Sequence, residues 1–304
     1  MFSSANVLQK YTMEQLVALG VSWVWLGLEG KGSQYTKLSG TDTVAFVKKL
    51  RDHGIRVLGS SIIGLEEHTP ENIDEAIEHA VSHNTEFHQF MLYTPIPGTA
   101  LFAEHEKKET LKSLADVSIA DIHGQHIFNY KHPHIKDGEE TELLLRAFRR
   151  DFEVNGPSVV RIVRAVLRGW KKYKNHPDAR VRSRFAHEAA NLPVRYSGVL
   201  WATRKFYRDK PQYVAQISEL LKELHHEFGW RSRLAAPIAG RYLYSKLKKQ
   251  QEMLAEGWTY EPPTFYETNF QEGPAGSEYI ETALACRDAP LASVRPDALI
   301  PVSS

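Results

Sequence analysis

The amino-acid sequence predicts an α/β protein that begins with parallel strands and continues as a mainly helical chain. Three apolar runs, at residues 21–28, 56–63 and 87–93, have the length of strands and do not alternate cleanly between apolar and polar residues. That pattern is typical of parallel strands covered on both faces. The strands start about thirty residues apart, which is the length of one strand-and-helix unit with a right-handed connection.

Amphipathic segments between these runs predict the connecting helices. In the first segment, apolar residues share one helical face, and Gly54 supplies a C-terminal stop. The second follows Thr69 and Pro70, which we interpret as an N-cap followed by proline in the first turn. Its apolar residues recur at the spacing of a core-facing helix, at Ile73, Ala76, Ile77, Ala80 and Val81.

The pattern changes after about residue 105. Residues 121–135 are rich in histidine, aromatic residues and turn formers, and we expect an ordered loop or short strands there. Helices are expected at 143–153, 158–173, 182–190, 199–207, 212–228 and 239–256. Beyond Gly257, Pro, Gly, Ser and Glu predominate, which predicts an extended or disordered tail. The chain therefore divides into residues 1–105, 106–141, 142–256 and 257–304.

Charge is distributed very unevenly along the chain, although the net charge is only +1. Residues 1–140 carry 12 Lys and Arg against 19 Asp and Glu, residues 141–250 carry 24 against 9, and residues 251–304 carry 2 against 9. A basic middle between acidic flanks indicates either an anionic partner or docking onto acidic surface of the same protein. The expected helix at 158–173 concentrates this charge along one side, at Arg161, Arg164, Arg168, Lys171, Lys172 and Lys174.

The composition limits both the class of protein that this chain can be and the kinds of cysteine-based site that it can contain. With 42% hydrophobic and 25% charged residues, the chain resembles a soluble globular protein. It has no apolar run near the roughly 18 residues of a membrane span and no secretory signal pattern, so we expect a cytoplasmic protein, peripheral to a membrane if its basic surface binds lipid. The single cysteine, Cys286, excludes an internal disulfide and any multi-thiolate metal site built by this chain alone.

In parallel α/β folds, ligands bind at the carboxyl ends of the strands. The first run ends in Glu29, whose carboxylate can accept hydrogen bonds from a ribose or an ammonium group, or can simply be solvated at a loop entrance. After the second run, Gly64 suits a turn that lets a flat ring lie against the strand backbone, with Ile62 in apolar contact. The third run ends in YTPIPGT, which is either a stiff pocket wall or only a turn.

Taken together, WVWLGLEGKGSQYTKLSG, HGIRVLGSSIIGLEEHTPEN and HQFMLYTPIPGTALF resemble radical S-adenosylmethionine enzymes of the cobalamin-binding subclass. The resemblance implies that residues 1–105 are about strands four to six of a TIM-like barrel, that is, part of its C-terminal half. In that family these strand ends contact the ribose, the methionine and the adenine of S-adenosylmethionine. The matching cofactor-binding positions are Glu29, Ser60, Ile62, Gly64, Glu67, Pro95, Pro97 and Gly98, with Ser60 where the family has glycine.

The family also binds a four-iron four-sulfur cluster through a CxxxCxxC loop and carries a cobalamin domain, and this sequence has neither. One cysteine cannot assemble the cluster. The resemblance therefore implies the C-terminal part of an enzyme that abstracts hydrogen from, or methylates, an unactivated carbon. We expect it to be inactive alone, as a truncated chain or one half of a split protein whose partner carries CxxxCxxC and the cobalamin domain. Catalytic residues cannot be assigned from the sequence.

The helical region resembles extensions that close such barrels over substrate. Its entry segment offers polar candidates for substrate contact at Asp121, His123, Gln125, Asn129, His132 and His134. Their spacing matches no strong metal-ligand pattern, so we expect loop packing or substrate contacts rather than a metal site. The basic surface suggests an anionic or lipid substrate. The alternative is a non-enzymatic basic helical module that binds anionic lipid or nucleic acid.

Overall fold

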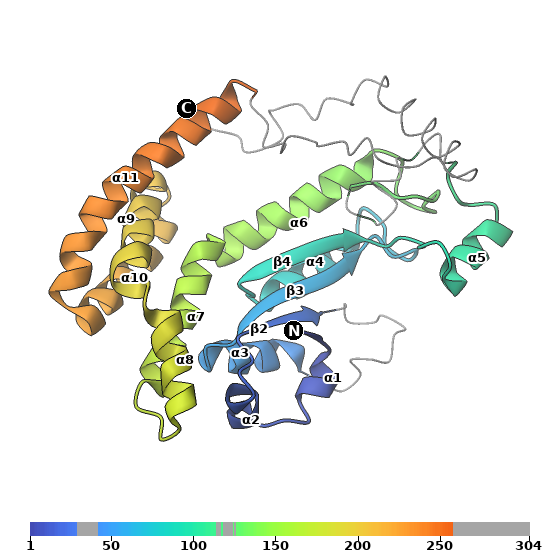
Figure 1. Ribbon diagram of the computed structural model, residues 1–304. Helices are drawn as coiled ribbons and strands as arrows, with labels where there is room; N and C mark the ends of the chain where they lie inside the picture. Colours follow the sequence, from blue (N-terminus) through green and yellow to red (C-terminus); the bar gives the residue numbers. More distant parts are fainter. Residues whose placement is uncertain (29–41, 114–116, 118–123, 125, 258–304) are drawn as a thin grey trace, which may run out of the picture. The chain divides into compact units, whose positions relative to one another are not determined.

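The computed structural model describes residues 1–28, 42–113, 117, 124 and 126–257 (Figure 1). The chain divides into two compact units, Met1–Arg241 and Tyr242–Ser304. Four parallel strands form one sheet in the order in which they occur in the sequence: β1 (Phe2–Ser3), β2 (Trp23–Gly27), β3 (Arg56–Ile63) and β4 (Phe87–Leu92). The three strands predicted from the sequence are confirmed, and the first residues of the chain add a short edge strand. Glu29 and the tail beyond Gly257 lie outside the described residues.

The helices follow the predicted order with some changes at their ends. Their bounds are α1 (Ala5–Leu8), α2 (Met13–Ala18), α3 (Thr43–Asp52), α4 (Ile73–Ser82), α5 (Ala100–Lys107), α6 (Glu139–Asn155), α7 (Ser158–Tyr173), α8 (Ala179–Ala189), α9 (Ser197–Phe206), α10 (Pro211–Phe228) and α11 (Trp230–Ala255). A short π-helical turn (Leu192–Tyr196) precedes α9. Helix α7 has the predicted bounds, whereas α11 begins well before residue 239, and α1, α2 and α5 were not predicted.

The two faces of the sheet are covered differently, which corrects the expectation that both are fully buried. Along β3, buried and half-buried residues alternate. The buried side chains of β2, β3 and β4 pack in the same cores as α3 and α4, so these connecting helices cover one face. The opposite face, here called the open face, carries Phe2, Trp23, Trp25, Leu58, Ser60, Ile62, Phe87, Gln89 and Met91. Of these, Trp25 is 38% exposed and Phe87 is 43% exposed.

Aromatic side chains dominate the amino-terminal part of the open face. The strand register places Phe2, Trp25, Leu58 and Phe87 in one row across all four strands. Phe2 and Trp25 have ring centroids 5.1 Å apart, and Trp23 stacks on Phe87 at 5.9 Å. This apolar row crosses the whole sheet on the side away from the connecting helices.

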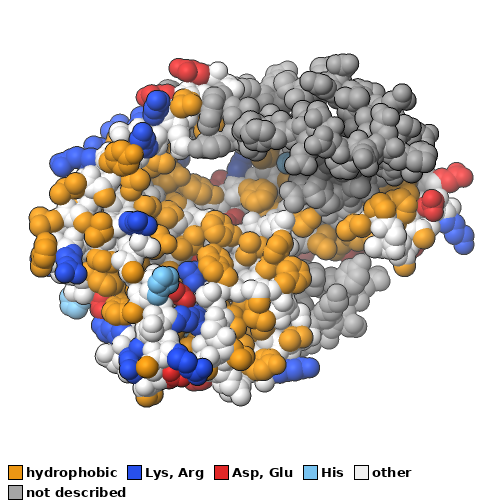
Figure 2. All heavy atoms as spheres, in the orientation of Figure 1, with side chains coloured by type: hydrophobic (Ala, Val, Ile, Leu, Met, Phe, Trp, Pro, Cys, Tyr) orange, Lys and Arg blue, Asp and Glu red, His pale blue; other side chains and the backbone are white. Residues whose placement is uncertain are grey.

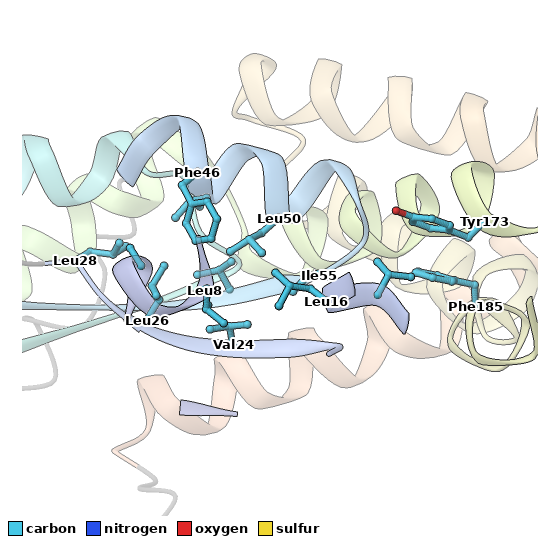
Figure 3. Close-up of a cluster of buried hydrophobic side chains, with 14 of the residues drawn as sticks. Leu8, Leu16, Val24, Leu26, Leu28, Phe46, Leu50, Ile55, Tyr173 and Phe185 are labelled. Carbon is cyan, nitrogen blue, oxygen red and sulfur yellow. The ribbon is translucent and has the colours of Figure 1, made fainter. Parts of the chain in front are cut away.

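Three cores hold the first unit together. The first lies between β2 and α3 and includes Tyr173 and Phe185 from α7 and α8, whose rings stack at 4.6 Å (Figure 3). The second joins β3, β4 and α4 to α6 and to Phe128, Tyr130 and Ile135. The third lies among α7, α9 and α10. The predicted boundaries at residues 105 and 141 therefore do not separate independent cores, because the second core spans both.

Two buried ion pairs fix the start of β4. Arg51 of α3 lies 2.6 Å from Glu86, whose second carboxylate oxygen accepts the backbone N–H of Val57 at 2.7 Å. Arg161 of α7 pairs with Asp151 at 2.8 Å and also donates to the carbonyl of Thr85 at 2.7 Å. Each buried charge thus has a partner of opposite sign, and Glu86, Asp151 and Arg161 form further hydrogen bonds that help to offset the cost of burying these charges.

Candidate functional site

The carboxyl end of β3 leads into a tight loop shaped by a histidine. Gly64 follows the strand with φ +70°, and the Nδ1 of His68 accepts the backbone N–H groups of Gly64 and Leu65 at 3.0 and 3.2 Å. Burial lowers the pKa of His68, which favours the neutral ring that can accept these bonds. The loop is therefore held by a side chain four residues after its glycine.

An aromatic segment, residues 128–132, lies over this loop. The ring of Phe128 fills the space beside Gly64, where a Cβ would approach it to 2.6 Å. The hydroxyl of Tyr130 donates to the carbonyl of Gly64 at 3.4 Å. The ring of Phe128 thus occupies the space beside Gly64 where the sequence analysis expected the flat ring of a ligand.

His132 fastens the same segment to the loop. Its Nδ1 accepts the backbone N–H groups of His134 and Ile135 at 3.1 and 3.0 Å, so the proton of the neutral ring lies on Nε2. That Nε2 donates to the carbonyl of Leu65 at 3.0 Å. Burial lowers the pKa of His132. Both ring nitrogens form hydrogen bonds with backbone groups, so His132 connects the aromatic segment to the loop after β3.

The end of β4 is tied to the same segment. Pro95 is buried, and its carbonyl accepts a hydrogen bond from the side-chain amide of Asn129 at 2.7 Å. Thr99 then caps α5, its hydroxyl accepting the N–H of Phe102 at 3.2 Å. Pro97 and Gly98 are exposed. The predicted stiff turn therefore has an inner half fixed by Asn129 and an outer half in solvent.

The carboxyl-terminal half of the open face carries Ser60, Ile62, Gln89 and Met91, and the described fold leaves one buried acceptor among them without a partner. Ser60 lies in register with Gly27 on one side and Gln89 on the other, and Ile62 lies in register with Met91. The Oε1 atom of Gln89 is buried and has no hydrogen-bond partner among the described residues. A buried acceptor without a partner costs free energy, so it is a natural position for a ligand donor.

A second unpartnered buried atom lies beneath the aromatic segment. His105 is buried against Tyr130, with ring centroids 4.6 Å apart, and its Nδ1 lies 2.8 Å from the hydroxyl of Thr110. Its Nε2 makes no hydrogen bond within the described chain, and the nearest carboxylate, that of Glu66, is 3.8 Å away. Burial raises the pKa of Tyr130, so that phenol stays neutral.

The predicted site residues are thus divided among different environments. Glu29, Asp121, His123 and Gln125 lie outside the described residues. Ser60 and Ile62 lie on the open face, whereas Gly64, Pro95, Asn129 and His132 are buried within the loop packing, and Glu67 and His134 are exposed. The sequence reasoning missed Gln89, His68 and Tyr130. Only Gln89 had a local signal, as a polar residue at an alternate position of an apolar strand.

The cations of α7 mostly have partners within the chain. Arg168 lies 3.0 Å from Asp52 of α3, and the other pairs are Arg161–Asp151, Lys171–Glu223 and Lys174–Glu227. A pocket beside α7 is lined by Arg164, Leu167, Arg168, Glu219 and Glu223, so charges of both signs face it. For this helix the structure favours docking onto acidic groups of the same protein over the anionic partner that the charge pattern also allowed.

Neither a metal site nor a membrane span is found in the described part of the chain. No three His, Cys, Asp or Glu residues there are grouped so that they could hold a metal ion. No described helix is both long and apolar enough to cross a bilayer. Comparison with known proteins found no matching family model, no matching curated protein and no matching solved structure.

Proposed function

We propose that this chain binds S-adenosylmethionine at the carboxyl end of the open face and supplies that arc of a radical S-adenosylmethionine barrel. The order β1-β2-β3-β4 supports an arc, because each strand is added on the same side of the previous one. A doubly wound sheet instead reverses its order and has helices on both faces. Here the connecting helices α3 and α4 cover one face, and the other is apolar and partly exposed.

The observation that carries the proposal is the unpartnered Oε1 of Gln89 beside Ser60 and Ile62. Ligands of parallel α/β folds bind at this end of the strands. Adenine has an amino group and methionine an ammonium group, and either can donate to Gln89. Ile62 and Met91 offer apolar contact to a flat ring. Glu29, two residues beyond β2, is assigned to the ribose and methionine by the family resemblance alone.

The four-iron four-sulfur cluster of this enzyme class does not fit the residues of this chain. The sequence has one cysteine, Cys286, and the cluster is held by several thiolates. We therefore assign the cluster, the one-electron step and the cobalamin domain to protein outside this sequence, carrying the CxxxCxxC loop. The reaction class proposed for the assembled enzyme is hydrogen abstraction from, or methylation of, an unactivated carbon. This chain would hold and orient S-adenosylmethionine for it.

Equilibrium dialysis with labelled S-adenosylmethionine tests the binding site. Gln89→Leu removes the acceptor with little change in size and should weaken binding about tenfold, the effect of losing one hydrogen bond to a buried donor. Gln212→Leu, at an exposed position of α10, is the matched control and should bind as the wild type does. The proposal fails if the folded protein does not retain S-adenosylmethionine, or if Gln89→Leu binds it unchanged.

The alternative function, a basic module that binds lipid or nucleic acid through residues 158–174, gains little from the structure. Its cations at Arg161, Arg168, Lys171 and Lys174 are already paired with carboxylates. A phosphate would have to compete with these pairs, so α7 is a poor candidate for an anion-binding surface. A different helix carries the charge and the apolar surface that membrane contact requires.

A further inference from the structure

Helix α11 has two faces of opposite character. Ser232, Ala236 and Gly240 are buried, and this run of small residues at every fourth position forms the inner face. Trp230, Leu234 and Ile238 recur at the same spacing but are 69%, 58% and 69% exposed. We call these three residues the α11 stripe. Helical geometry at 3.6 residues per turn places the stripe opposite the inner face.

Such exposure is unusual for side chains of this size. Single exposed apolar residues are common, but three at helical spacing form a contiguous patch, which indicates an interaction surface. The stripe does not lie on the sheet, so it is independent of the S-adenosylmethionine site proposed above. Something other than that ligand must account for it.

Cations flank the stripe and have no counter-charge in the described structure. Arg231, Arg233 and Arg241 are exposed and form no ion pair with any described residue, in contrast to the cations of α7. The guanidinium of Arg231 lies 6.0 Å from the ring of Trp230. Figure 2 shows hydrophobic and basic side chains interspersed over the helix that Figure 1 labels α11.

We propose that the α11 stripe inserts into the interface of an anionic lipid bilayer while the flanking arginines bind its phosphates. Tryptophan favours the bilayer interface, and an amphipathic helix with arginine beside its apolar face lies in the interface plane. Guanidinium groups match phosphate oxygens in geometry and charge. A second copy of the chain is disfavoured as the occupant, because a symmetric contact would bring these like charges together. The lipid surface satisfies both the apolar stripe and the cations.

Vesicle sedimentation tests this with the full chain and two lipid compositions. The protein should bind phosphatidylcholine vesicles that contain phosphatidylglycerol and should bind pure phosphatidylcholine much more weakly. Neutralising Arg231, Arg233 and Arg241 to Gln should weaken binding by roughly fivefold per cation, the usual contribution of a basic residue near an anionic surface. The matched control neutralises three exposed lysines elsewhere, Lys10→Gln, Lys107→Gln and Lys131→Gln, and should bind nearly as the wild type does.

The stripe itself is tested by two further variants. Leu234→Ser with Ile238→Ser should abolish sedimentation, and circular dichroism should show an unchanged fold because both residues are exposed. Trp230→Phe should still bind but should lose the part of the fluorescence that brominated lipid quenches in the wild type. Binding that is independent of phosphatidylglycerol, or unaffected by the serine substitutions, overturns the proposal. A halved molar mass of the serine variant in solution would overturn it in favour of a second copy.

Discussion

Replacing Gly64 by alanine tests how the loop after β3 is built. Gly64 has φ +70°, a conformation that costs a residue with a side chain about 1 kcal/mol. A Cβ there would also lie 2.6 Å from Cζ and 2.9 Å from Cε1 of Phe128, which is too close for any real contact. Overpacking of this kind costs about 1–3 kcal/mol. The two contributions together predict that Gly64→Ala lowers the free energy of unfolding by about 2–4 kcal/mol.

Urea unfolding followed by circular dichroism, without any ligand, measures this loss. Gly98→Ala is the matched control, because Gly98 has φ +83° but no atom within 4 Å of the Cβ position. It should lose only the conformational part, about 1 kcal/mol. Adding Phe128→Leu to Gly64→Ala should remove most of the additional strain. If Gly64→Ala destabilises no more than Gly98→Ala, Phe128 does not occupy the space beside Gly64 and the account of the loop is wrong.

Two further predictions concern buried polar groups near the start of β4. Glu86→Ala should lower the free energy of unfolding by about 3–5 kcal/mol in urea, because it leaves Arg51 buried without its partner; a loss under about 1 kcal/mol would contradict this. Burial lowers the pKa of His83 and of His88 from 6.5 to about 4, so the unfolded chain binds protons between these pH values that the native chain does not. Stability should therefore be complete above about pH 6.5 and fall towards pH 4, by up to about 3 kcal/mol for each histidine. His88→Leu should flatten this dependence by about one proton, and an unchanged slope would refute the assignment.

The strands and most helices could be predicted because their signals are local. The run at 56–63 is apolar and ends at Gly64, and β3 has those bounds. Helix α4 shows where local signals compete. Thr69 and Asn72 are both capping residues, and they bond each other reciprocally in a turn, so the helix begins at Ile73 instead of following Pro70 directly.

Helix α11 shows a different limit of local prediction. Pro237 lies inside the helix, where proline ordinarily ends or kinks one, and a helix was expected only from residue 239. In the structure the helix begins directly after Gly229 and continues through the proline. The α11 stripe therefore lies in a segment where no helix was predicted, so its helical spacing could not be recognised.

Of the candidate site, only residues at or near the end of a strand could be predicted from the sequence. Ile62 was predicted from the strand end and Ser60 from the family resemblance, and both occupy alternate positions of β3 on the open face. The partners of Gly64 could not be found in this way. Tyr130 is 66 residues away in sequence, and its contact depends on how the aromatic segment packs over the loop. The same holds for His132, which the sequence marked for substrate and whose ring nitrogens both bond backbone.

Hydrogen–deuterium exchange with and without S-adenosylmethionine tests the central claim most directly. The full chain is compared at saturating ligand, with S-adenosylmethionine replaced by free methionine as the control. Binding at the carboxyl end of the open face predicts slower exchange at residues 60–67 and 92–99, with little change in α7, α9 or α10. Protection confined to the helices beyond residue 139, or none at all in either strand-end segment, would contradict the assignment of this sheet to S-adenosylmethionine.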